Sequence, residues 1–185
     1  MMEINRLLDE NNVKSAFMLY QKFQEKAACC RNSSKLILLI DRFEADFRAN
    51  ITRKARELTI KNIKKNFEYL PKYSQILKTN FKNNTPVEKI DYTSNCALLQ
   101  ESQEVFSLMK SEDEFKELFR KQFGDYLQNA ILKNIDPRNL FDKMIDLFCF
   151  CSLYETFRAE VFKNDISQIS LMSIEPNFIE KLKVI

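Results

Sequence analysis

Two pairs of residues have the type and spacing to do chemistry. Cys149 and Cys151 could offer two thiolates to a metal ion, and Asp142 and Asp146 could bind a cation or act as paired carboxylates. Residues two apart on a helix point about 200° apart, so the two cysteines cannot face one ion from the same helix. We therefore expect cysteines that fill apolar space and aspartates on a solvated helix surface.

The side chains on which most enzymes depend are missing from this sequence. It contains no histidine, which excludes imidazole catalysis, serine–histidine triads and imidazole metal ligands. Gly124 is its single glycine, so glycine-rich phosphate loops are excluded as well. We expect a binding protein that is not an enzyme and has no cofactor or metal of its own.

The composition predicts an all-α fold. The chain has 185 residues, enough for one domain or for a compact domain with a helical extension. One glycine and four prolines allow few tight turns, which favours long helices with short links over hairpins. Sixteen phenylalanines and no tryptophan predict a core rich in phenylalanine.

Apolar residues repeat at steps of three and four in the first part of the chain. Asn32, Ser33 and Ser34 form a polar break that provides an N-cap for the second helix. The repeat predicts an N-terminal three-helix bundle within residues 1–80, with helices at 13–28, 34–48 and about 53–70.

Residues 81–95 are predicted to be a connector, preceded by a possible short helix at 72–80. A helical extension follows over 96–185. Its helix starts are marked by three signals: a capping box formed by Ser111 and Glu114, the pair Asp136-Pro137, and Pro176 before a last short helix.

The charge is divided between the two halves of the chain. Residues 1–90 hold 18 Lys and Arg against 10 Asp and Glu, a net charge of +8, whereas residues 91–185 hold 11 against 16, a net charge of −5. Such a division can steer an acidic partner to the first half and a basic partner to the second. It is also consistent with two solvated faces that attract each other.

The cysteines and the N-terminus indicate a compartment. Five cysteines with no paired spacing predict a reducing environment: cytosol, nucleus or mitochondrial matrix. No apolar run has the roughly 20 residues of a membrane span. The first residues form neither a signal peptide nor a cleaved matrix presequence, so import into mitochondria would use internal signals.

Two short phrases on the first two predicted helices resemble a known family. Leu19-Tyr20-Gln21 stands in the first helix, and Phe47-Arg48-Ala49-Asn50 closes the second. In order and rough spacing they resemble the LYR-motif proteins, which have Leu-Tyr-Arg early in the first helix and Phe-Arg-x-Asn at the end of the second. Gln21 stands where the family has arginine, and Lys22 is a partial substitute for it.

The resemblance implies a hollow bundle that binds acylated mitochondrial acyl carrier protein. The acyl chain on the carrier's phosphopantetheine arm would enter the bundle, while basic side chains hold the carrier's acidic surface. The partner-binding residues that it implies are Leu19, Tyr20, Gln21, Lys22, Phe47, Arg48, Arg53 and Lys54.

The family further implies a role in the mitochondrion. We expect a non-catalytic accessory subunit or assembly factor of a respiratory complex on the matrix side, with complex I as the first candidate. The extension over 96–185 would pack on neighbouring subunits.

Two other kinds of function are open. A cytosolic or ciliary helical adaptor would use the acidic second half; residues 113–127 and 147–162 faintly resemble the BART domain, although the stretch between them is too short for that fold. A nucleic-acid binder would use the seven basic residues of 48–65, but no known reading motif accompanies them. We expect no nucleic acid as partner.

Overall fold

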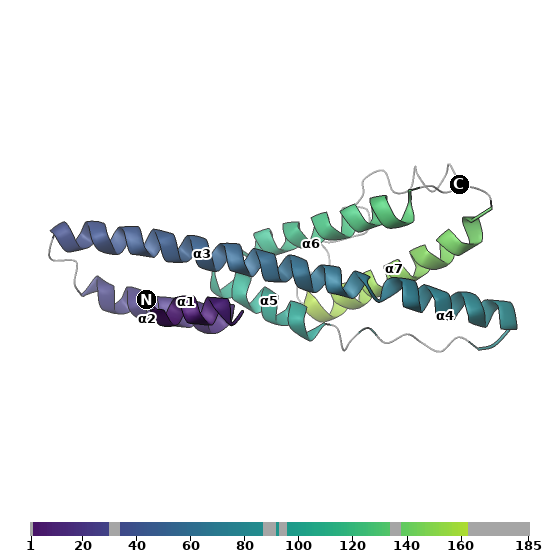
Figure 1. Ribbon diagram of the computed structural model, residues 1–185, viewed down its shortest axis with the longest axis horizontal. Coiled ribbons are helices and arrows are strands. Elements are labelled where there is room, and N and C mark those ends of the chain that lie inside the picture. The colour runs from purple at the N-terminus through teal and green to yellow at the C-terminus, as the bar shows by residue number, and fades with distance from the viewer. Residues whose placement is uncertain (1, 30–33, 87–91, 93–95, 134–137, 163–185) are drawn as a thin grey trace. The chain divides into compact units, whose positions relative to one another are not determined.

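The computed structural model describes residues 2–29, 34–86, 92, 96–133 and 138–162 (Figure 1). All regular structure in these residues is helical, which confirms the predicted all-α fold. The helices are α1 (Met2–Asp9), α2 (Val13–Ala28), α3 (Ser34–Phe67), α4 (Leu70–Asn83), α5 (Ala97–Leu108), α6 (Glu112–Tyr126), the short π-helix η2 (Leu127–Ile131) and α7 (Leu140–Val161).

The second and third predicted helices are one helix. The predicted break between residues 48 and 53 is wrong, because α3 continues through it to Phe67. The intervening sequence contains neither glycine nor proline, so nothing in it favours ending the helix. The chain turns just before Pro71, which stands in the first turn of α4, where a missing N–H costs least.

The helix starts agree with the predictions only in part. Asn12 caps α2 by accepting a hydrogen bond from the Ser15 amide at 3.2 Å. α6 begins after Ser111 as predicted, but the side chains of the capping box have other partners. The Ser111 hydroxyl donates to the Phe106 carbonyl, and the Glu114 carboxylate accepts from Arg56.

Contacts divide the chain into two compact units. The first unit contains Met1–Thr59 and Ser102–Phe115, and the second contains Ile60–Glu101 and Lys116–Ile185. The predicted domain boundary at 81–95 falls largely outside the described residues and stays a prediction, as do the Asp136-Pro137 helix start and the helix after Pro176, which lie wholly outside them.

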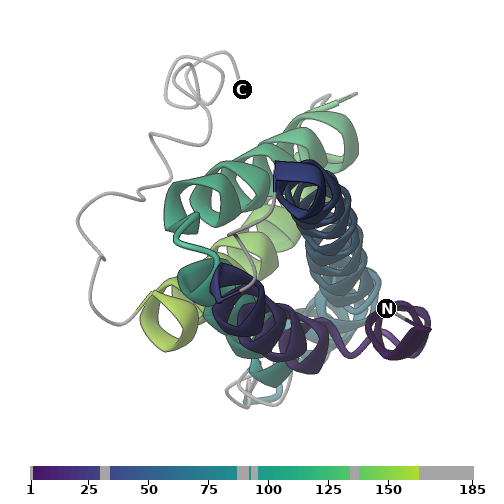
Figure 2. The same ribbon diagram turned by 90° about the vertical axis from the view of Figure 1, so that its left-hand side faces the viewer.

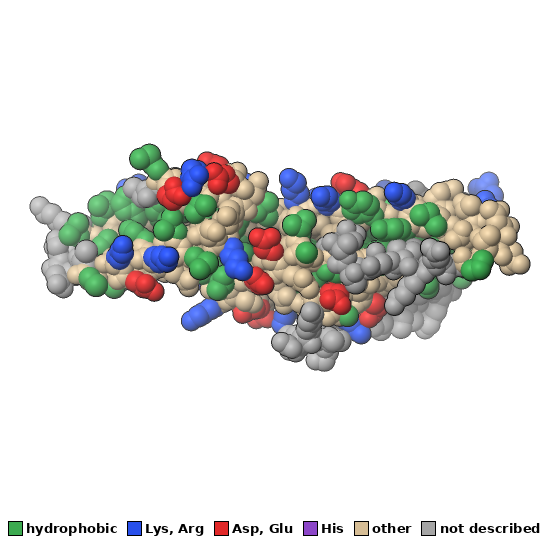
Figure 3. Space-filling model, turned by 90° about the horizontal axis from the view of Figure 1, so that it is seen from below, with side chains coloured by type: hydrophobic (Ala, Val, Ile, Leu, Met, Phe, Trp, Pro, Cys, Tyr) green, Lys and Arg blue, Asp and Glu red, His purple; other side chains and the backbone are tan. Residues whose placement is uncertain are grey.

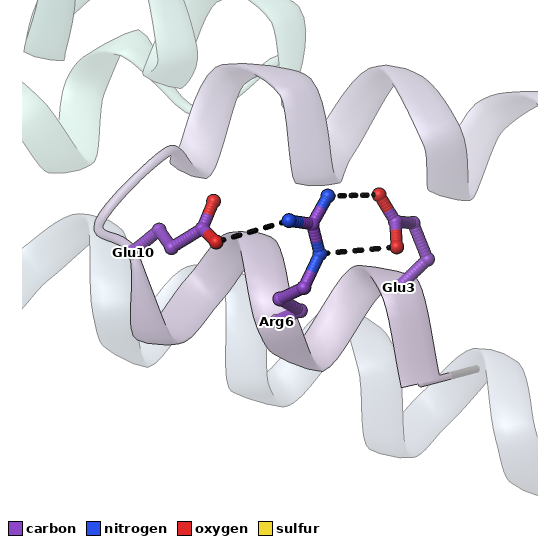
Figure 4. A network of polar contacts seen from close by, with 3 residues as sticks. All are labelled: Glu3, Arg6 and Glu10. Atoms are coloured by element: carbon purple, nitrogen blue, oxygen red, sulfur yellow. Dashed lines mark hydrogen bonds and ion pairs between the residues drawn. The ribbon is translucent and has the colours of Figure 1, made fainter.

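In the first unit, α1 packs on α2 and α2 lies along α3 (Figures 1 and 2). Arg6 on α1 donates to Glu3 and Glu10 on the exposed side of the hairpin (Figure 4). Since all three side chains are more than half exposed, this network contributes little to stability. The core is mostly apolar, and includes Ile4, Leu8, Val13, Phe17, Tyr20, Phe47 and Ile51.

Residues 102–115 complete the first unit, although they follow Thr59 by more than forty positions. Phe106 and Phe115 are buried, with ring centroids 5.6 Å apart. Two ion pairs connect this segment to the first helices: Lys14 with Glu104 at 2.6 Å and Arg56 with Glu114. The end of α5 and the turn after it are thereby held in the N-terminal unit.

The second unit has an aromatic core, as the phenylalanine content predicted. The rings of Phe119 and Phe123 stack with centroids 4.3 Å apart, and α7 surrounds them with Phe150, Tyr154 and Phe157. α4 packs against α7. Within the described residues, no helix is both long and apolar enough to cross a membrane.

Candidate partner-binding site

A pocket of about 300 Å³ opens on the first unit at three of the predicted binding residues. Its walls come from α2, from the middle of α3 and from the turn between α5 and α6. The lining residues are Phe17, Tyr20, Gln21, Gln24, Arg48, Ile51, Leu108, Met109 and Lys110. The two family-like phrases therefore meet in space, because one contributes Tyr20 and Gln21 and the other contributes Arg48.

The pocket combines an apolar floor with a polar rim. Phe17, Tyr20 and Ile51 are buried, at 8%, 4% and 0% exposure, so they form fixed walls. Gln21 and Arg48 are exposed at the surface. An arrangement of this kind suits a ligand with an apolar part and a polar or charged end.

Tyr20 is held between α2 and α3. Its hydroxyl donates to the Glu44 backbone carbonyl at 3.4 Å, and its ring lies 6.2 Å from the ring of Phe17. Burial, and secondarily the Glu44 carboxylate, raise the pKa of Tyr20, while the Arg48 guanidinium acts in the opposite direction. Tyr20 is therefore a neutral wall of the pocket at physiological pH, and its predicted burial, like that of Phe47, is confirmed.

The charged residues that line the pocket are both basic. They are Arg48 on α3 and Lys110 in the turn after α5, and no carboxylate lies among the lining residues. Neither cation forms an ion pair with another described residue. Sequence reasoning missed Lys110, because it lies some sixty residues beyond the second phrase and no local signal links the two.

The other predicted binding residues lie off the pocket lining. Lys22 is exposed, Leu19 and Lys54 are half-buried, and Phe47 is a core residue at 6% exposure. Arg53 is exposed and pairs with Glu57 one turn further along α3, at 2.8 Å. The structure thus brings three of the eight residues together in the pocket.

The basic stretch of 48–65 is partly neutralised by its neighbours. Besides the Arg53–Glu57 pair, Arg56 is paired with Glu114. These carboxylates weaken the case for a surface that binds nucleic-acid phosphates.

The cysteine and aspartate pairs of α7 lie in surroundings that suit a structural role. Burial raises the pKa of the Cys149 thiol to about 11, and burial likewise raises the pKa of Cys151. Asp146 accepts from Ser74 and from Lys78, whose Nζ lies at 3.0 Å. The described residues include no group of three or more side chains able to hold a metal ion.

The second unit has its own surface features. A shallow groove of about 630 Å³ runs between the α3–α4 corner and the α6–η2 region, with Phe67, Pro71 and Tyr126 among its lining residues. Elsewhere α7 exposes Phe141, Met144 and Phe148, each by more than half. None of the predicted binding residues lines the groove.

Comparisons with protein-family models, with curated proteins and with solved structures found no significant match to this chain. The resemblance to LYR-motif proteins therefore rests on the two phrases alone.

Proposed function

We propose that the protein is a non-catalytic accessory subunit or assembly factor of a mitochondrial respiratory complex, with complex I as the first candidate. In this role it docks acylated mitochondrial acyl carrier protein on the matrix side through its first unit. The observation that carries the proposal is the convergence of Tyr20, Gln21 and Arg48, from two phrases 27 positions apart, on one pocket.

The chemistry of the pocket supports this partner. An acyl carrier is an acidic protein whose phosphopantetheine arm ends in an apolar chain. The apolar floor would receive the start of that chain, at roughly 0.8 kcal/mol for each buried methylene. The cationic rim would attract the carrier, with each exposed charge pair contributing about 0.2–1 kcal/mol and mostly setting orientation.

The apolar face of α7 supports the second part of the role. Phe141, Met144 and Phe148 are exposed by 54%, 61% and 61%. Side chains of this size, close together on one helix, are typical of a surface that packs on another protein. In the proposed role this surface contacts a neighbouring subunit. The same observation favours the alternative, a cytosolic or ciliary adaptor that uses its second half.

The direct test is mass spectrometry of the native protein purified with its parent complex. An acyl-phosphopantetheine carrier bound to the chain is the expected result. A parent complex without the carrier, together with a purified chain that does not bind acylated carrier in solution, would overturn the proposal. Cell fractionation separates the alternative, since an adaptor would be absent from mitochondria.

A matched pair of arginines tests the pocket itself. Arg48→Glu and Arg53→Glu make the same change of charge on one helix, but only Arg48 lines the pocket. Both variants should lower the association rate at low salt, because exposed charges steer an acidic partner. Only Arg48→Glu should still weaken binding at high salt, in titrations of acylated carrier. Equal losses at high salt would place the contact outside the pocket.

A further inference from the structure

The turn that closes the pocket has an unusual residue at its centre. Lys110 has φ of 55°, in the left-handed region. Its amide donates to the Ser107 carbonyl at 3.0 Å, and the next amide, of Ser111, donates to the Phe106 carbonyl at 2.9 Å. This pair of hydrogen bonds is the Schellman motif that ends many helices, with Lys110 at the position where glycine is most common.

The backbone conformation of the turn does not favour lysine. Left-handed backbone disfavours residues with a Cβ atom, and asparagine tolerates it better than most. The two other described residues with positive φ, Asn11 and Asn84, are both asparagines. At the third such position, Lys110, a long cationic side chain is present although left-handed backbone disfavours it, and this side chain lines the pocket.

The same pocket lacks a cation where the family motif would provide one. Gln21 stands in the place of the motif arginine, and it is on the pocket lining together with Lys110. Lys22, the substitute suggested by the sequence, is exposed on α2 and does not line the pocket. The position of Lys110 at the rim therefore makes it the better candidate for the missing charge.

We propose that Lys110 supplies the positive charge that Gln21 leaves out, and that with Arg48 it makes the pocket rim a binding site for an anionic group of the carrier. This inference rests on the proposed function. The anionic group is an oxyanion, either the phosphodiester of the phosphopantetheine arm or a carboxylate of the carrier surface. Both accept hydrogen bonds from an ammonium and a guanidinium.

The test replaces the charge without disturbing the turn. Lys110→Asn removes the cation and keeps a residue that accepts left-handed backbone, so the thermal midpoint should not fall. If the midpoint does fall, Lys110→Gly is the second variant. Titration calorimetry with acylated carrier should show a loss of affinity of about fivefold, the upper end of what an exposed charge pair contributes. Lys26→Asn, at another exposed position of α2 that does not line the pocket, is the matched control and should change affinity less than about twofold.

A rescue variant makes the assignment specific. Gln21→Arg in the Lys110→Asn background should recover most of the lost affinity, because it returns a cation to the same pocket. Titration with carrier that lacks the phosphopantetheine arm identifies the oxyanion. If the Lys110→Asn loss disappears with this carrier, the phosphodiester is the ligand, and if the loss persists, a surface carboxylate is.

The inference and the function on which it rests fail in different ways. If the unmodified chain binds no acylated carrier and its parent complex contains none, the proposed function is wrong and this role of Lys110 is wrong with it. If the unmodified chain binds and Lys110→Asn binds within about twofold of it, or if Lys26→Asn loses as much, Lys110 has no such role and the proposed function stands.

Discussion

Replacing Phe106 with alanine tests what holds the third wall of the pocket in place. The segment 102–115 carries the α5–α6 turn and is attached to the first unit in two ways. The first way is burial of its apolar side chains: Phe106 is 0% exposed, as Phe115 of the same segment is at 1%, and their ring centroids lie 5.6 Å apart. The ion pairs Lys14–Glu104 and Arg56–Glu114 are exposed, with only the Glu114 side chain below 40%.

The two kinds of contact differ in magnitude. Truncating a buried phenylalanine to alanine costs about 3–5 kcal/mol, since the lost apolar contacts and the remaining cavity add together. The two exposed ion pairs are worth about 0.2–1 kcal/mol each, hence at most about 2 kcal/mol in sum. Against a total stability of about 5–15 kcal/mol, the burial of Phe106 should decide whether the segment stays in place.

Urea unfolding followed by circular dichroism measures the difference in the free energy of unfolding. Phe106→Ala should lose more than the double variant Glu104→Gln/Glu114→Gln, and Phe106→Leu should lie between Phe106→Ala and the unmodified chain. Hydrogen exchange should show faster exchange over 102–115 in Phe106→Ala. If the double variant loses as much stability as Phe106→Ala, the segment is held by charge and the reasoning is wrong.

Three further perturbations have defined outcomes. Phe47→Asp buries a charge without a partner, and should cost at least about 3 kcal/mol in urea unfolding; it should lower carrier binding only through loss of folded protein. Asp146→Asn leaves Lys78, which is only 18% exposed, without its carboxylate, so the free energy of unfolding should fall by about 1–3 kcal/mol. Adding Lys78→Met should recover part of this loss in a double-mutant cycle. Burial raises the folded-state pKa of Cys149 to about 11 from an ordinary value near 9, so the folded state holds this proton more tightly than the unfolded state does. Thermal midpoints should therefore fall as pH rises from about 9 to 11, and the fall should be smaller in Cys149→Ala.

Local patterns predicted much of the fold. The apolar repeat in 13–28 placed α2 correctly and identified Tyr20 as buried, because one face of an isolated helix can be read from spacing alone. Phe47 followed from the same periodicity on α3. The absence of histidine and the scarcity of glycine excluded whole classes of site without any structure.

The errors arose where local signals were weak or the contacts were distant in sequence. The end of the family-like phrase suggested a helix boundary near Asn50, but no residue there breaks a helix, and α3 continues. Glu114 matched a capping box, but Arg56 took its carboxylate. Lys110 could not be found at all, since its left-handed backbone lacks the glycine that would mark it and its neighbours in the pocket lie far away in the sequence.

The position of Lys110 also changes the meaning of the charge division. Counting by halves places the docking surface for an acidic partner in residues 1–90, because that half has the net charge of +8. Yet the pocket draws one cation, Arg48, from the basic half and the other, Lys110, from the acidic half. Attraction at a few ångströms depends on which charges face the ligand, whereas net charge acts on approach from a distance. The segment 102–115 is therefore part of the candidate binding site, and a carrier would contact both halves of the chain at once.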